Sequence, residues 1–399
     1  MFIPIIFHSR SLLKLIQQQL HFSGMNNSVL SLLKATAIPS PLSRVAEKVL
    51  SGERISIDDG NLLFNHGSLP FLSILADTVS QGVSSGHVFF NRNFHIEPTN
   101  ICVNHCAFCS YRRRKGEEGC WEFSIEDIKE KVASYKNSGA TEVHIVGGVH
   151  PDRDVHYYAD MMRAVKESMP DIHIKAFTAV EIDSMCRQAG MTIEDGLTLL
   201  KDAGLGSMPG GGAEIFDEQL RQKICPDKTG SAEWLRIHKI AHKLSIPTNA
   251  TILYGLLETY EQRIEHMDRL RTLQDETIGF NAFIPLKFRH YNNSFSHIKE
   301  TTTVEDLKNY AVSRIFLDNI PHLKAYWPMI GKQVAQLSLA FGVDDLDGTI
   351  DDSTKIYSMA GSEEQNPSAS TDELVALIKG AGKIPAERDT IYNIIRIFP

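Results

Sequence analysis

Residues 94–109 read FHIEPTNICVNHCAFC, a segment with alternating apolar residues at its start that leads directly into three closely spaced cysteines. We predict a β-strand over 94–101 and, after it, a loop that carries Cys102, Cys106 and Cys109 in the spacing C-x3-C-x2-C. A chain of 399 residues with six cysteines is not a small disulfide scaffold. The tight cluster of thiols therefore indicates a metal site in a reducing compartment.

Beyond this strand, short apolar runs alternate with amphipathic segments of helical length. This alternation is typical of βαβ units and a parallel sheet. It predicts an α/β fold, a (β/α)8 TIM-type barrel with an N-terminal helical extension. The last two runs are weakly marked, so a partial barrel of six units stays open. The predicted strands are 94–101, 142–147, 172–178, 205–208, 248–254, 279–285, 322–326 and 342–346.

The predicted organisation has three regions. Residues 1–90 form an N-terminal extension and helical segment, 91–350 the barrel, and 351–399 a C-terminal loop and helix that pack on the barrel. The first residues are apolar and then basic, the reverse order of a secretory signal. Translation can begin at Met1 or at Met25, and the sequence does not decide between them.

The composition is that of an ordinary globular protein, with 42% hydrophobic and 23% charged residues. The net charge of −8 and the lack of a polybasic tail argue against a nucleic-acid partner. No window reaches the roughly 18 apolar residues of a membrane helix, so no membrane association is predicted. We expect a cytoplasmic protein.

The three clustered thiols suit an iron–sulfur cluster. Three thiolates can hold three irons of a [4Fe-4S] cluster and leave the fourth iron without a protein ligand. An open coordination position distinguishes a reactive metal site from a structural one. The alternative is a zinc knuckle, closed by His105 or Cys120, in a non-enzymatic metal-binding protein.

Several predicted strands end in glycine-rich or polar residues, where a barrel places its active site. Each motif alone fits a tight turn or an acid at a helix start equally well. Their convergence on one rim is what predicts a ligand site. The candidates are Gly147, Gly148, His150, Glu181, Ser207, Glu214 and Tyr254.

Two arginines near this rim are candidates for holding a carboxylate. Arg112 opens the run RRRK after the cysteines, and Arg289 follows the sixth strand. The guanidinium group forms bidentate hydrogen bonds with carboxylates. The alternative for Arg112 is a solvated charge run or a patch that meets an electron donor.

The cysteine loop resembles that of the radical S-adenosylmethionine (SAM) enzymes. The resemblance implies that the cluster is ligated by Cys102, Cys106 and Cys109 and binds SAM. One electron then splits SAM into methionine and a 5′-deoxyadenosyl radical. A donor such as flavodoxin or ferredoxin is implied. The cofactor-binding residues implied are Phe108, Gly147, Gly148, Glu181, Ser207, Glu214 and Tyr254.

The strings GGVHPD, AFTAVEI, SMPGGGAEIF and TNATILYGLLE resemble the enzymes of the futalosine route to menaquinone, closest to the aminodeoxyfutalosine synthases. This implies a transferase that adds the deoxyadenosyl radical to the vinyl CH2 of an aryl enol ether, 3-[(1-carboxyvinyl)oxy]benzoate. The products implied are 6-amino-6-deoxyfutalosine, methionine and bicarbonate or CO2. Substrate contacts are expected from His150, Arg112 and Arg289. The alternative is the cyclic dehypoxanthine futalosine synthase of the same route, which releases 5′-deoxyadenosine.

Overall fold

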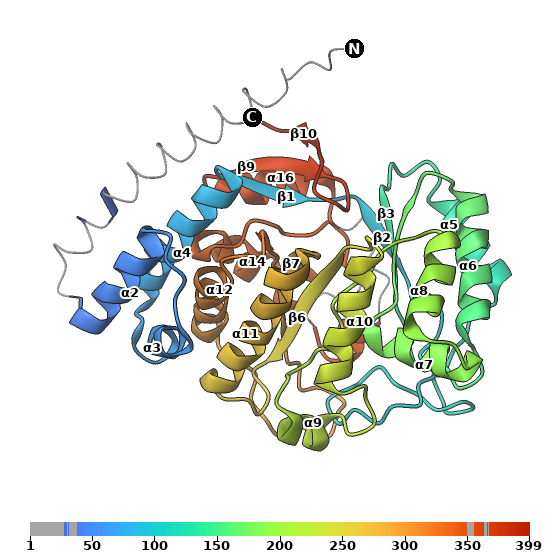
Figure 1. The fold of residues 1–399 in the computed structure, drawn as a ribbon. Helices are drawn as coiled ribbons and strands as arrows, with labels where there is room; N and C mark the ends of the chain where they lie inside the picture. The colour runs from blue at the N-terminus through green and yellow to red at the C-terminus, as the bar shows by residue number, and fades with distance from the viewer. Residues whose placement is uncertain (1–27, 30, 32–37, 349–354, 363–364, 366) are drawn as a thin grey trace, which may run out of the picture.

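The computed structural model describes residues 28–29, 31, 38–348, 355–362, 365 and 367–399. Its centre is a curved wall of parallel strands with helices on the outside (Figure 1), which confirms the predicted α/β fold. The strands pair in the orders β2-β3-β4-β5 and β6-β7-β8. A bridge between Met208 and Thr248 joins the two groups. The bounds of the strands in the wall are β2 Asn93–Ile96, β3 Glu142–Ile145, β4 His173–Ala176, β5 Leu205–Ser207, β6 Thr248–Tyr254, β7 Phe280–Lys287 and β8 His322–Leu323.

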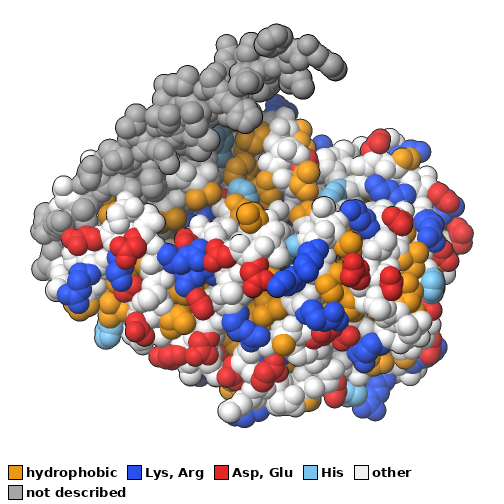
Figure 2. All heavy atoms as spheres, in the orientation of Figure 1, with side chains coloured by type: hydrophobic (Ala, Val, Ile, Leu, Met, Phe, Trp, Pro, Cys, Tyr) orange, Lys and Arg blue, Asp and Glu red, His pale blue; other side chains and the backbone are white. Residues whose placement is uncertain are grey.

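The helices that follow the strands cover the outer face of the wall. Many begin where the sequence offers a cap: Ser124, Thr178 and Thr259 each form a reciprocal capping box with the acid or amide three residues on. On the face shown in Figure 2, basic and acidic side chains are interspersed over these helices. The outer helices are α5 Ile125–Ser134, α6 Val155–Ser168, α7 Ala179–Ala189, α8 Ile193–Asp202, α9 Glu218–Ile224, α10 Ser231–Lys243, α11 Tyr260–Thr277 and α12 Thr303–Phe316.

Alternate side chains of a wall strand point into two different regions, the apolar core and the cavity inside the barrel. Phe94 and Ile96 of β2 are fully buried in the apolar core. His95, between them, lines the cavity inside the barrel. Successive side chains of a strand point to opposite faces, and β2, β3, β4, β6 and β7 each contribute to both the core and the cavity. The cavity side carries the polar residues considered below.

The predicted eighth strand at 342–346 is wrong. Only Asp345 forms isolated bridges there, with Phe89 and Lys324. The reason is local: the Asp344 side chain accepts a hydrogen bond from the Leu323 amide at 2.8 Å, and Asp345 accepts one from the Asp347 amide at 2.7 Å. These side chains replace part of the ladder that a strand would make. The described wall therefore has seven strands.

The two ends of the chain meet in a second, smaller sheet that the sequence did not predict. β1 (His87–Phe90) pairs in parallel with β9 (Ile384–Arg388), and β9 pairs antiparallel with β10 (Ile394–Ile397). The predicted last helix is present as α16 (Thr371–Gly380). This helix and the small sheet both lie at the top of Figure 1. This sheet joins the first predicted region to the last. The division of the chain into three regions stays a prediction.

The remaining helices lie before the wall or between β8 and α16. They are α2 Ser40–Leu50, α3 Ile57–His66, α4 Leu69–Ser84, α13 Trp327–Ile330, α14 Lys332–Ser338 and α15 Ile356–Met359, with a 3-10 turn at Leu339–Phe341. Both candidate start residues, Met1 and Met25, lie outside the described residues. None of the helices in the described ranges is both long and apolar enough to cross a bilayer.

Candidate active site

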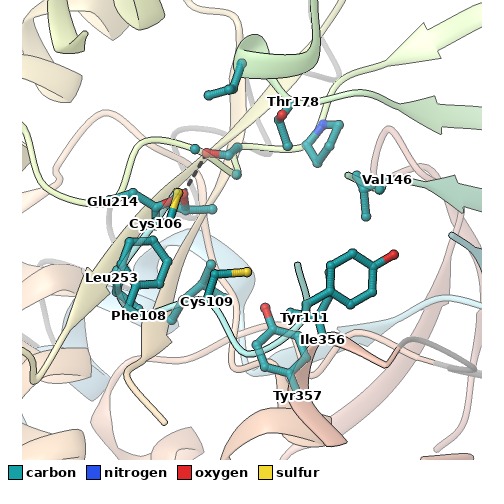
Figure 3. Close-up of a pocket in the computed structure, with 18 of the residues that line it drawn as sticks. Cys106, Phe108, Cys109, Tyr111, Val146, Thr178, Glu214, Leu253, Ile356 and Tyr357 are labelled. Carbon is teal, nitrogen blue, oxygen red and sulfur yellow. Dashed lines mark hydrogen bonds between the residues drawn. The ribbon is translucent and has the colours of Figure 1, made fainter. Parts of the chain in front are cut away.

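A cavity of about 300 Å³ opens inside the wall of strands. Cys102, Cys106 and Cys109, called here the clustered cysteines, all line it. Figure 3 shows Cys106 and Cys109 facing Val146 and Thr178 across the space. The structure therefore brings the thiols and the ends of β3 and β4 together around one cavity, as the barrel prediction requires.

The loop that carries the clustered cysteines is fixed by backbone hydrogen bonds on both sides. The Cys102 amide donates to Arg113 at 3.0 Å, and the Val103 amide donates to Val149 after β3 at 2.9 Å. Across the cavity mouth, the Ala107 amide donates to Ile224 at the end of α9 at 2.8 Å. The thiols are thus held in place by the protein chain itself.

The three thiols are partly buried, with one cation nearby. Burial raises the pKa of the Cys102 thiol, and it raises that of Cys106 to about 12, although the Lys228 ammonium opposes the second shift. Lys228 forms an ion pair with Glu214 and lies 5.3 Å from the centre of the Phe108 ring. Thiols in such a place ionise when a metal takes up the charge, so the donor set fits a thiolate-bound cluster.

The arrangement fits a cluster better than a closed zinc knuckle. Among the described residues, no three His, Cys, Asp or Glu side chains converge closely enough to hold a single metal ion. The irons of a four-iron cluster are separate, and each takes its own thiolate. Neither proposed fourth zinc ligand is among the described residues that line the cavity. His105 instead pairs with Asp227 at 2.9 Å and is half exposed.

The glycines after β3 are needed for a close approach of two backbones. A Cβ on Gly148 would lie 2.3 Å from the Ile101 carbonyl oxygen, and one on Gly147 would lie 2.8 Å from that of Thr99. The Gly148 amide donates to Thr99 at 2.7 Å. Gly147 and Gly148 line the cavity as predicted, but their lack of a side chain first serves contact with the cysteine loop.

Glu181 is a buried carboxyl at the cavity wall. It occupies the third position of α7, where it accepts hydrogen bonds from the Thr178 amide at 2.7 Å, the Thr178 hydroxyl at 2.8 Å and the Gly147 amide at 3.1 Å. Burial raises its pKa to about 7, against the lowering effect of those hydrogen bonds. It is a candidate partner for a cationic ligand group. Glu214 also lines the cavity, already paired with Lys228.

Three residues predicted to contact a ligand are not among the described residues that line the cavity, and their ligand contacts stay predictions. Tyr254 points to the other face of β6, where its hydroxyl donates to Asp306 at 3.0 Å. Ser207 Oγ lies 2.8 Å from His173 Nε2. The His150 ring lies 3.1 Å from Glu122 and accepts from the Asp152 amide at 3.0 Å. All three are satisfied by the protein.

The two predicted arginines both line the cavity but differ in their partners. Arg289 pairs with Glu300 at 3.1 Å and donates to the Gly361 carbonyl at 2.7 Å. The Nη1 atom of Arg112 is buried and has no hydrogen-bond partner among the described residues. A guanidinium nitrogen buried without a hydrogen-bond partner is costly. Arg289 Nε also lacks one among the described residues, but Arg289 already has Glu300 as its counter-ion. Arg112 is therefore the better candidate for binding an anionic ligand.

Sequence reasoning missed a set of charged and imidazole side chains on the cavity wall. Three sit within strands between apolar neighbours: His95 in NFHI, His144 in EVHI and Lys175 in HIKA. A basic residue in the middle of a buried parallel strand was the available signal, since such strands usually read as continuous apolar runs. The missed lining residues are His95, His144, Lys175, Lys228, Lys324 and Asp347.

Comparison with known proteins agrees with this geometry. The model of the radical SAM superfamily matches residues 96–270, and that of the CofH/MqnC C-terminal region matches residues 277–398. Among solved structures, methylornithine synthase is similar in fold, with a TM-score of 0.69 at 18% identity over 86% of this chain and 97% of that chain. The fold and cavity are those of a radical SAM enzyme, a class that uses a [4Fe-4S] cluster and SAM.

Relatives of higher sequence identity identify the family to which this chain belongs within the radical SAM enzymes. Aminodeoxyfutalosine synthase of Thermus thermophilus is 45% identical over 89% of this chain and 96% of its own length. The Streptomyces coelicolor protein of the same name is 40% identical over 88% and 93%. A Methanothermobacter thermautotrophicus protein named 5-amino-6-(D-ribitylamino)uracil–L-tyrosine 4-hydroxyphenyl transferase is 36% identical over 82% and 90%. The chain belongs to the aminodeoxyfutalosine synthase family of radical SAM enzymes.

Proposed function

We propose that this chain is an aminodeoxyfutalosine synthase, which converts 3-[(1-carboxyvinyl)oxy]benzoate and SAM into 6-amino-6-deoxyfutalosine, methionine and bicarbonate or CO2. The observation that carries the proposal is the 45% identity to a synthase over nearly the whole chain. The unpaired Arg112 in the cavity supports it, because the substrate is doubly anionic.

The clustered cysteines would hold three irons of the [4Fe-4S] cluster, with the open fourth iron facing the cavity. The chemistry that a bound cluster and SAM supply is one-electron cleavage of the sulfonium to methionine and a 5′-deoxyadenosyl radical. The part of the protein is to bind and orient SAM and the substrate and to shield the radical from solvent. Glu181 and Glu214 offer carboxylates toward the cofactor, and Phe108 forms part of the wall beside them.

Apolar side chains protect the reacting groups from water. Leu253 of β6 and Ile284 and Leu286 of β7 line the cavity opposite the strands that carry the imidazoles. Exclusion of water prevents the loss of reactive intermediates to solvent. Arg112 would hold a substrate carboxylate and so orient the vinyl group. We also propose a flavodoxin or ferredoxin as the electron donor, in the cytoplasm, since the reaction begins with a single electron.

The test is anaerobic reconstitution followed by turnover of SAM labelled in its adenosyl group together with the enol ether. We expect the label to become covalently part of 6-amino-6-deoxyfutalosine, read by mass spectrometry. Parallel reactions contain dehypoxanthine futalosine, or 5-amino-6-(D-ribitylamino)uracil with L-tyrosine. Release of free 5′-deoxyadenosine with conversion of either of these, and no labelled product from the enol ether, would overturn the proposal.

A further inference from the structure

A row of basic and imidazole side chains lies inside the barrel below the cysteine loop. His95 of β2 pairs in register with His144 of β3, which pairs with Lys175 of β4. Lys324, directly after β8, faces the same cavity. These four residues are called here the lower layer. A barrel interior is normally filled by branched apolar side chains. The lower layer departs from this packing, and a function in ligand binding can explain the departure.

The height of the lower layer follows from the strand geometry. His144 precedes Gly147 by three residues, which is about 10 Å along a strand. Gly147 and Gly148 contact the backbone before the clustered cysteines. The lower layer is therefore at the end of the cavity that is remote from the thiols, and it is separated from them by the length of a small ligand.

The lower layer offers hydrogen-bond donors beside one carboxylate that also lines the cavity, Asp347, which is held by Lys324. Lys175 pairs with Glu142 at 2.8 Å, and Lys324 pairs with Asp347 at 2.9 Å. These pairs fix the ammonium groups, and each ammonium has three N–H donors, so donors remain for a ligand. Burial and the neighbouring His95 and Lys175 hold the pKa of His144 well below its usual range. Its Nε2 atom has no hydrogen-bond partner among the described residues.

The opposite wall is apolar in part, because Leu253, Ile284 and Leu286 line the cavity there beside the polar Asn249, Thr251 and Lys287. Ile284 of β7 stands in register with Thr251 of β6, and Ile284 and Leu286 line the cavity. A ligand that lies between the two walls meets hydrocarbon on one side and N–H groups on the other. An aromatic ring that carries a carboxylate matches both.

We propose that the lower layer binds the aryl carboxylate of the substrate, while Arg112 binds the carboxylate of the vinyl end. The inference rests on the proposed function. Arg112 lies only three residues after Cys109, so the two anchors are at opposite ends of the cavity. Holding both carboxylates would direct the vinyl carbon toward the clustered cysteines, where the radical forms, and the benzoate toward the interior.

The test compares binding of the enol ether with that of its analogue without the aryl carboxylate, 2-phenoxyacrylate. Dissociation constants are measured on the reconstituted protein with SAM and without reductant, so that no turnover is needed. For the wild-type protein, loss of the aryl carboxylate should weaken binding about 10- to 100-fold, the usual effect of losing hydrogen bonds to a charged group. In the His144→Phe variant, the ratio of the dissociation constants of the two ligands should fall toward one.

Two further variants make the comparison specific. Lys175→Met combined with Glu142→Gln removes a lower-layer cation while it keeps the local charge balance, and it should also reduce the penalty. Arg112→Met should weaken both ligands and leave the penalty for the aryl carboxylate at its wild-type size. Iron content and thermal unfolding verify that each variant is folded.

An unchanged penalty in both lower-layer variants, or failure of the wild-type protein to discriminate the two ligands, would overturn the inference. Turnover is read separately, with reductant. If the wild-type protein binds the enol ether with the expected pattern but makes no 6-amino-6-deoxyfutalosine, the proposed function fails while the lower layer stands as an arylcarboxylate site.

Discussion

Glu181 gives the sharpest prediction, because its stability effect and its functional effect have opposite signs. Its side chain is 6% exposed, and its pKa is raised from 4.5 to about 7 by burial. In the unfolded chain the same carboxyl titrates near its usual value. The folded protein therefore holds the proton more tightly, and its stability falls as the pH rises from about 4.5 to about 7. The full difference is about 3 kcal/mol.

The change Glu181→Gln removes the charge and keeps the shape. The single amide oxygen of a glutamine can still complete the capping box with Thr178, but the Gly147 amide, which donates to the second carboxylate oxygen of Glu181, then loses its acceptor. Relative to the wild-type protein, we expect the stability of the variant to rise by about 2.5 kcal/mol between pH 5 and pH 8, while the lost hydrogen bond from Gly147 affects both pH values equally. Urea unfolding of both proteins at the two pH values measures the difference.

The same change should weaken cofactor binding. If the ionised Glu181 pairs with a cationic group of SAM, loss of that bond costs about 1.5 to 3 kcal/mol, or about 10- to 150-fold in apparent affinity. Equal pH dependence of stability in the two proteins would refute the burial argument. A variant that is less stable yet binds SAM as tightly as the wild-type protein would show that Glu181 serves only the structure of α7.

Three other outcomes follow from the site. Replacing any one of the clustered cysteines by Ala should abolish the visible cluster absorbance or SAM cleavage, and Cys120→Ala should keep both; loss in the Cys120 variant alone would contradict the ligand assignment. Arg112→Met should raise the KM for the enol ether about 10- to 150-fold with little change in the KM for SAM, as steady-state kinetics would show. Lys228→Met leaves Glu214 buried without its cation and should cost about 3 to 5 kcal/mol of unfolding free energy. Adding Glu214→Gln should restore most of that loss, and no recovery in urea unfolding would refute the pairing argument.

The sequence predicted the parts of this protein in which local pattern and global fold agree. The alternation of strands and helices and the thiol-bearing loop after the first wall strand were readable, because each depends on a short segment and its period. The ends of β3 and β4 were placed at the cavity for the same reason. The small sheet was not readable, since it pairs β1 with β9 from the other end of the chain.

Side-chain direction was harder to predict than strand position. Tyr254 ends β6 as expected, yet Thr251 and Leu253 of the same strand face the cavity. A shift of one residue in the pleat moves a side chain to the opposite face. A motif at a strand end therefore identifies the rim, but it does not tell which of two adjacent side chains meets a ligand.

The charged interior of the barrel links the C-terminal region to the site. Arg388 of β9 pairs with Asp345 at 2.6 Å, and Asp345 lies 3.8 Å from Lys324 of the lower layer. Buried ion pairs are often no more stabilising than apolar side chains of the same volume, so stability alone gives little reason for this chain of charges. If Lys324 helps to bind the substrate, Asp345 and Arg388 contribute to that binding, because they fix the position of the Lys324 ammonium group. The region after residue 277, which matches the CofH/MqnC C-terminal region, would then take part in substrate recognition through β8 and β9, while the radical SAM part supplies the cysteines.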